Sequence, residues 1–310
     1  MNLHYRSILL ISVVMLAFLS GCIKDNLDDC FQGVNVRFYS MTPCQIDTTY
    51  PGDIKDITLC VFDKNDVLVS TRKASDISIG KDYSQNVETP SGLLSAVAWS
   101  GLKSEFFDVQ SLKVGSTTKH DLLFRLKRAA NSVPDLLSNK VYYGESPAIY
   151  VPETDNSADI LEYTSIDMQE ITNRIRIYIE GLPRVSDYEV EIESNNGSMN
   201  LDGSIAQDNL IKYSAEHFDR DGMLDAYFTL LKLDTGHSNT LVIRSKITGT
   251  ELYRGSLLGT LLLKNPDINL ACDHDFIIKF TTKDQCSCGT YMITEIWVNN
   301  WLVHSYDTEM

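Results

Sequence analysis

Basic residues are scarce in this sequence: 27 lysines and arginines stand against 42 aspartates and glutamates, and the formal net charge is -15. No segment gathers lysines and arginines into a basic cluster. A nucleic-acid-binding protein needs such a cluster, because phosphate contacts supply much of its affinity. The composition therefore predicts that nucleic acid is not a partner. An acidic balance favours solubility rather than any specific ligand.

Recognised catalytic motifs are also absent. The sequence has no Gly-x-Ser-x-Gly elbow, no phosphate-binding loop and no His-Glu-x-x-His motif, and its six histidines form no ligand-spaced pair. Residues 219–225 form only part of a calcium loop, since two of the ligand positions are unfilled. His274 stands between two aspartates, which is typical of the polar start of a strand. The sequence predicts no enzyme, no cofactor and no metal.

Only one long apolar run occurs, over residues 8–18, and Arg6 precedes it. This layout is typical of a secretory signal peptide, and the run is shorter than the ~20 apolar residues that span a bilayer. Leucine, serine and glycine then lead directly to Cys22, whose thiol bacteria can acylate. We expect residues 1–21 to be removed and Cys22 to carry lipid, at ~0.8 kcal/mol of membrane affinity per buried methylene. An ordinary signal peptide and a signal anchor are the alternatives.

Seven cysteines occur, and an even number remains if Cys22 is acylated. The remaining cysteines are Cys30, Cys44, Cys60, Cys272, Cys286 and Cys288. An even number in an exported chain makes disulfides possible. The six cysteines fall into two groups of three, at positions 30, 44 and 60 and at positions 272, 286 and 288. This grouping favours pairing inside each half of the chain, with one cysteine of each group left free or paired between the halves. The last two form a Cys-Ser-Cys sequence, which lacks the Cys-x-x-Cys spacing that structural zinc sites favour.

Helical periodicity is almost absent, and residues 104–113 are the best short helical candidate. Short segments of alternating apolar and polar residues occur instead, with turn residues between them. Residues 57–63 form such a segment, and residues 67–69 return after a turn, which predicts a hairpin. Residues 195–197 predict a second hairpin turn. Each half therefore holds about seven strands, and the sequence predicts an all-β fold of two tandem β-sandwiches.

Prolines and acidic residues gather between residues 129 and 160, where the alternating pattern weakens. This composition suits an exposed linker, so we expect a domain boundary there. The predicted parts are a signal peptide (1–21), an acidic tether (22–32), an N-terminal sandwich (33–160) and a C-terminal sandwich (161–310).

Several segments match, in order, the landmarks of one bacterial family. They are residues 22–30, 57–63, 96–101, 141–144, 172–177 and 296–307. On these landmarks the chain resembles the FimB/Mfa2 family of fimbrial anchor lipoproteins of Bacteroidales. Asn300 stands where the family usually has glycine, a difference that concerns only the local turn type.

The resemblance implies two transthyretin-like, Greek-key sandwiches and a subunit at the base of a fimbrium. Such a subunit fastens the major fimbrial stalk subunit to the outer membrane through lipid at Cys22, on the cell surface, and limits fimbrial length. In related stalk subunits, proteolysis of an N-terminal strand opens a groove that a partner's C-terminal segment fills. The same cleavage would remove Cys22, so we expect this chain to keep its N-terminal strand.

The C-terminal strands are the segment that we expect to contact the stalk. The predicted contact residues are Ile293, Ile296, Val298, Trp301 and Val303.

Two other functions stay open at this point. A surface adhesin or glycan-binding lipoprotein would use exposed aromatic residues such as Trp301, Tyr142 and Tyr143. Trp99 and Trp297 are expected in the core. A hydrolase ranks last, because no recognised catalytic motif occurs. It stays open because the paired carboxylates of a glycosidase cannot be recognised without a fold.

Overall fold

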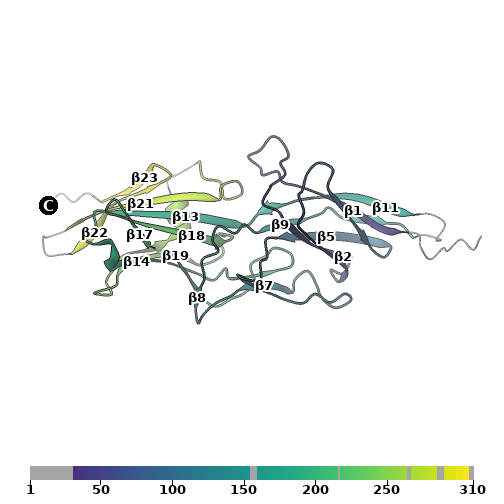
Figure 1. Ribbon diagram of the computed structural model, residues 1–310, viewed down its shortest axis with the longest axis horizontal. Coiled ribbons are helices and arrows are strands. Elements are labelled where there is room, and N and C mark those ends of the chain that lie inside the picture. The colour runs from purple at the N-terminus through teal and green to yellow at the C-terminus, as the bar shows by residue number, and fades with distance from the viewer. Residues whose placement is uncertain (1–30, 154–158, 216, 264–266, 285–289, 307–310) are drawn as a thin grey trace, which may run out of the picture.

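The computed structural model describes residues 31–153, 159–215, 217–263, 267–284 and 290–306 (Figure 1). Residues 1–30, with the expected signal peptide, Cys22 and nearly all of the tether, lie outside the described residues. Nearly all of the regular secondary structure in the described chain is strand, and its one α-helix is the short α2 (Leu257–Leu262). No helix in this described part is long and apolar enough to cross a membrane. The all-β prediction is confirmed, and two sandwiches lie end to end in an elongated molecule (Figure 1).

Three sheets form the half that contains β1. The first sheet has the order β11 (Ile160–Asp167), β1 (Gln32–Tyr39), β4 (Ser84–Glu88). The second has the order β12 (Gln169–Glu170), β9 (Tyr142–Glu145), β5 (Gly92–Ser100), β2 (Asp56–Asp63), β3 (Leu68–Ser75), and β10 (Ile149–Val151) also pairs with β5. The third has the order β15 (Ser198–Asn200), β7 (Leu122–Leu126), β6 (Phe107–Val109).

The second sheet is covered on both faces. Ala96 and Ala98 of β5 belong to a core shared with β1, whereas Val97 and Trp99 of the same strand belong to a core shared with β6 and β7. Successive side chains of a strand point to opposite faces, so a strand covered on both sides needs apolar residues at nearly every position. This explains the almost continuous apolar sequence of β5.

Two sheets form the other sandwich. The larger has the order β17 (His217–Arg220), β18 (Met223–Leu231), β13 (Thr172–Glu180), β21 (Asp275–Asp284), β22 (Tyr291–Val298), β23 (Trp301–Ser305). The smaller has the order β20 (Glu251–Ser256), β19 (Asn239–Ser245), β14 (Tyr188–Ser194), β16 (Ile211–Ser214), β8 (Ser132–Val133). The alternating isoleucines of β13 (Ile175, Ile177 and Ile179) are fully buried between them.

The sheets of the first half extend beyond residue 160, where we expected the boundary. β11 pairs in parallel with β1 along its whole length, and β12 pairs with β9, so this set of sheets reaches Glu170. Strands also cross between the halves: β8 pairs with β16, and β15 pairs with β7. Trp99 Nε1 donates to the carbonyl oxygen of Leu201 at 3.0 Å. The two sandwiches are therefore joined by shared sheets and by one continuous core.

The predicted hairpin over residues 57–69 is confirmed, because β2 and β3 pair antiparallel. The Asp63 carboxylate accepts hydrogen bonds from the backbone N–H of Asn65 and Val67 and closes the turn. The hairpin predicted at residues 195–197 is wrong: β14 pairs with β16 and β19, whereas β15 leaves to pair with β7.

Residues 104–113, the best short helical candidate, form a turn followed by β6 and not a helix. Phe107 packs edge to face against Phe124 of β7, with ring centroids 4.9 Å apart. Burial of this aromatic pair overrides the weak local preference for helix.

One disulfide, Cys44–Cys272, joins the two halves of the chain. The prediction of pairing inside each half is therefore wrong for Cys44 and Cys272, and the alternative of a pair between the halves is confirmed for them. Cys60 is buried and free, and burial raises the pKa of its thiol to about 11. Cys30, Cys286 and Cys288 lie outside the described residues.

Candidate functional site

β23 is an edge strand of the six-stranded sheet and pairs only with β22 among the described strands. A strand at the edge of a sheet leaves a row of backbone donors and acceptors free, and an extended segment of another chain can pair with them. The hairpin turn between β22 and β23 contains Asn299 and Asn300, whose φ values are 45° and 69°. Asparagine tolerates this left-handed conformation, which suits a tight hairpin turn.

The turn is fixed to the rest of the sheet. Asn299 N donates to the carbonyl oxygen of Ile277 in β21, and the Asn299 side-chain oxygen accepts from Ile277 N, both at 2.9 Å. The β22–β23 hairpin is thus held in place before any partner arrives.

The structure separates the five residues that we expected to contact a partner. Four of them are buried and belong to the core of the sandwich: Ile293, Ile296, Val298 and Val303. Their side chains cannot reach a partner in this conformation, and they hold the hairpin on the sandwich. Trp301 is 51% exposed and does lie on the surface.

The outer face of this sheet carries a row of apolar side chains that was not predicted from the sequence. Trp297 lies opposite Lys279 of β21 and opposite Leu302 of β23, and Ile277 is two residues from Lys279, so these side chains share one face. Ile277 and Leu302 are exposed, and Trp297 is partly exposed rather than in the core. The signal was in the sequence, because Ile296 and Val298 point inward and Trp297 must then point outward.

Charged residues border this apolar row. Lys279 Nζ lies 2.8 Å from a carboxylate oxygen of Glu180. Burial alone would raise the pKa of Glu180, but the hydrogen bonds from Lys279 and Thr281 outweigh it and lower the pKa. The face therefore presents apolar side chains beside a fixed ion pair.

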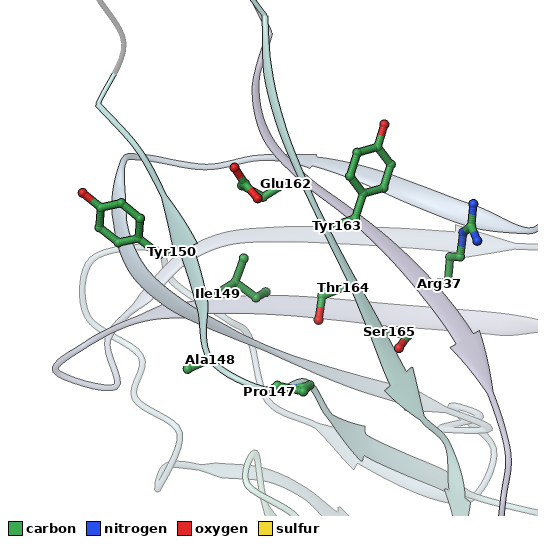
Figure 2. Close-up of a pocket in the computed structure, with 9 residues that line it drawn as sticks. All are labelled: Arg37, Pro147, Ala148, Ile149, Tyr150, Glu162, Tyr163, Thr164 and Ser165. Carbon is green, nitrogen blue, oxygen red and sulfur yellow. The ribbon is translucent and has the colours of Figure 1, made fainter.

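A second surface lies in the other sandwich, between β10 and β11 (Figure 2). It is an open groove of about 760 Å³. Tyr150 and Tyr163 are 64% and 67% exposed and stand on its opposite sides (Figure 2), and Arg37 and Glu162 add charge. These tyrosines are more exposed than Tyr50, the other exposed aromatic residue in the described part of this half.

The tyrosines that we expected to be exposed serve the fold instead. Tyr142 is buried, and the ring of Tyr143 packs on Trp99 with centroids 4.9 Å apart. Burial raises the pKa of both phenols, and nearby carboxylates raise it further. Neither side chain can form an open platform for a glycan.

The acidic patterns of the sequence also have structural roles. An Asp219 carboxylate oxygen accepts a hydrogen bond from Gly222 N at 2.9 Å and closes the turn between β17 and β18. His274 directly precedes β21, and Asp275 at the start of this strand pairs with Arg174. Across the described part of the chain, no group of three His, Cys, Asp or Glu side chains could hold a metal ion.

β1 lies in the middle of its sheet, with β11 on one side and β4 on the other. Gly33 is required there, because a Cβ at this position would lie 2.1 Å from the carbonyl oxygen of Val87. Removal of β1 would break two ladders at once. β1 and β11 lie towards one end of the molecule, and β22 and β23 lie towards the other (Figure 1).

Comparison with known proteins identifies close relatives of this architecture. The profile of the fimbrillin-A associated anchor proteins Mfa1 and Mfa2 matches residues 27–307. The minor fimbrium anchoring subunit Mfa2 of Porphyromonas gingivalis is 34% identical over 302 residues, which cover 95% of this chain and 92% of that protein.

Solved structures agree with this result. The structure of the fimbrial anchor protein Mfa2 from Porphyromonas gingivalis superimposes with a TM-score of 0.83 at 33% identity, over 89% of this chain and 100% of that one. A DUF1812 protein of Bacteroides thetaiotaomicron superimposes with a TM-score of 0.74 at 21% identity, over 90% of this chain and 99% of that one. At this lower identity the similarity shows the fold alone.

Proposed function

We propose that this chain, which belongs to the family of fimbrillin-A associated anchor proteins Mfa1 and Mfa2, fastens a fimbrial stalk to the outer membrane through lipid on Cys22. The observation that carries the proposal is the match to an anchoring subunit over nearly the whole of both chains. The apolar segment before Cys22 supports the lipid attachment. A role in limiting fimbrial length belongs to the same proposal.

The arrangement of the sandwiches supports a division of roles between the two ends. β1 follows the proposed lipid site by a short stretch of chain and lies towards one end of the molecule (Figure 1). The β22–β23 hairpin lies towards the opposite end (Figure 1). A lipid placed before β1 would therefore hold the hairpin away from the membrane, where a stalk subunit can reach it.

The stalk contact in this proposal uses the free edge of β23 and the side chains near it. An extended segment of the stalk subunit would pair with the β23 backbone, and Trp301 and Leu302 would cover it. The buried residues Ile293, Ile296, Val298 and Val303 would support the edge without touching the partner. β1 would stay in place, because both of its ladders are filled.

Replacement of Cys22 by alanine tests the proposal. Cells that carry Cys22→Ala should assemble stalks and release them, so stalk protein should move from the cell fraction to the culture medium. Cys60→Ser is the matched control, because it also removes one thiol but leaves the lipid site intact. Stalks that stay attached to Cys22→Ala cells would overturn the proposed role of the lipid.

A further inference from the structure

The Cys44–Cys272 disulfide joins two loops that meet where the sandwiches meet. Cys44 lies in the loop after β1, and Cys272 lies in the segment that leads into β21. The end of β1 is placed at this junction, because Met168 N donates to the carbonyl oxygen of Tyr39 at 2.7 Å just before β12. The start of β21 is there too, because Arg174 N donates to the carbonyl oxygen of His274.

We propose that this disulfide carries the pulling force of the fimbrium and keeps most of the chain out of the line of tension. The inference rests on the proposed function, in which force enters near the N-terminus and leaves near β23. Between these points the shortest covalent path runs along β1, across the two sulfurs, and then along β21 and β22 to β23. The two cysteines are 228 positions apart in sequence, and the chain between them is bypassed.

The strands that remain in the line of tension are well placed to resist it. β1 runs from its own end of the molecule to the junction (Figure 1). β21 runs from the junction into the other sandwich, and β22 returns antiparallel, so the turn before β23 lies beside Ile277, near the start of β21. Force along a strand loads all the hydrogen bonds of its ladders together, whereas force across a strand breaks them one after another. β1 has a ladder on each side, and so does β21, which lies between β13 and β22.

The loop that carries Cys44 is bonded to its own sandwich, and the segment that carries Cys272 is closed by hydrogen bonds within itself. Met41 N donates to a carboxylate oxygen of Asp167 in β11 at 2.9 Å. On the other side, Asn269 N donates to a carboxylate oxygen of Asp273 at 2.7 Å, and the Asn269 side chain contacts Cys44 Sγ at 3.4 Å. Hydrogen bonds within and between the two loops therefore hold the disulfide between the sandwiches.

The bypass protects the parts of the fold that join the halves non-covalently. β8 and β15, and the Trp99–Leu201 hydrogen bond, all lie in the chain between the two cysteines. Without the disulfide, the force would pass through the whole chain of both sandwiches, and either sandwich could unfold.

Single-molecule stretching tests the inference. The oxidised mature chain is pulled between its N-terminus and a tag placed after Met310, and its fully unfolded length is compared with that of Cys44→Ser/Cys272→Ser. The variant should extend further by roughly 800 Å, which is the 228 positions between the cysteines at ~3.5 Å each. Reduction of the unaltered chain by dithiothreitol should produce the same gain.

Cys60→Ser is the control, because it removes a buried cysteine that forms no disulfide. This variant should keep the short extension of the unaltered chain. Equal extension of the oxidised chain and the double variant would overturn the inference. The measurement needs neither stalk nor membrane, so its failure is distinct from a failure of the Cys22→Ala release experiment.

Discussion

Replacement of Arg174 by methionine tests how the two sandwiches are joined. Arg174 of β13 lies between carboxylates from both halves of the molecule. It donates to Glu170 of β12, and its Nε and Nη2 donate to Asp275 of β21 at 2.6 and 2.8 Å. The side chains of Arg174 and Glu170 are each only 9% exposed, whereas Asp275 is 75% exposed. Loss of the guanidinium would leave the largely buried Glu170 carboxylate with the Thr172 hydroxyl and Lys140 as partners.

The expected cost follows from the partners that remain. Removal of one member of a buried ion pair costs about 3–5 kcal/mol. Lys140 Nζ stays 3.8 Å from Glu170, and Asp275 can be hydrated. We therefore expect Arg174→Met to lower the free energy of unfolding by about 2–3 kcal/mol, below the range for a fully buried pair.

Urea denaturation at neutral pH measures this difference. Addition of Glu170→Gln to Arg174→Met should recover part of the loss, because it removes the uncompensated charge. Arg254→Met is the control: Arg254 is more exposed and pairs with Glu251 and Glu193. Lys212 stays 3.8 Å from Glu193, so the loss of Arg254 should cost at most about 1 kcal/mol. An equal effect of the Arg174 and Arg254 substitutions would refute the reasoning.

The pH dependence gives a second measurement on the same variant. The hydrogen bond from Arg174 lowers the pKa of Asp275 in the folded protein. Asp275 therefore contributes stability above its unfolded pKa of about 3.9, and this contribution is lost as the pH falls through the lower folded pKa. The stability difference between the unaltered chain and Arg174→Met should shrink when the pH is lowered from 5 towards 2. A difference that stays constant would contradict this assignment.

Three further predictions concern β1, the junction and the proposed stalk contact. Gly33→Ala should lower the free energy of unfolding by about 2–3 kcal/mol in urea, because its methyl group would clash with a backbone oxygen of β4. Trp99→Phe should lower it by about 1–3 kcal/mol, because the buried carbonyl of Leu201 loses its donor; an unchanged urea midpoint would contradict this. Trp301→Glu should change the free energy of unfolding by no more than about 0.5 kcal/mol but reduce stalk capture in pull-down assays, whereas Tyr163→Glu at the other end should leave capture unchanged.

Local patterns predicted the strands well. Alternation of apolar residues placed β2, and the turn at Asp63 placed the β2–β3 hairpin. These features depend on neighbouring residues, so a single sequence contains the information. The same alternation, applied to Trp297 between two inward residues, would also have placed that side chain on the outer face.

Pairing between distant segments could not be predicted in this way. β11 begins where the linker was expected, yet its partner β1 lies near the start of the chain. The Asn-Asn-Gly turn at residues 195–197 has the local chemistry of a hairpin, but packing beside Phe124 draws β15 to β7. Disulfide connectivity is likewise undetermined by cysteine spacing, and the bond between Cys44 and Cys272 required the fold.

The central claim is that lipid is attached at Cys22. Mass spectrometry tests it most directly, on native protein extracted from outer membranes with detergent. The account predicts an N-terminal peptide that begins at Cys22 and carries fatty acyl chains, together with co-purified stalk subunit. A mature chain that begins elsewhere, or an N-terminal cysteine without acyl chains, would contradict it.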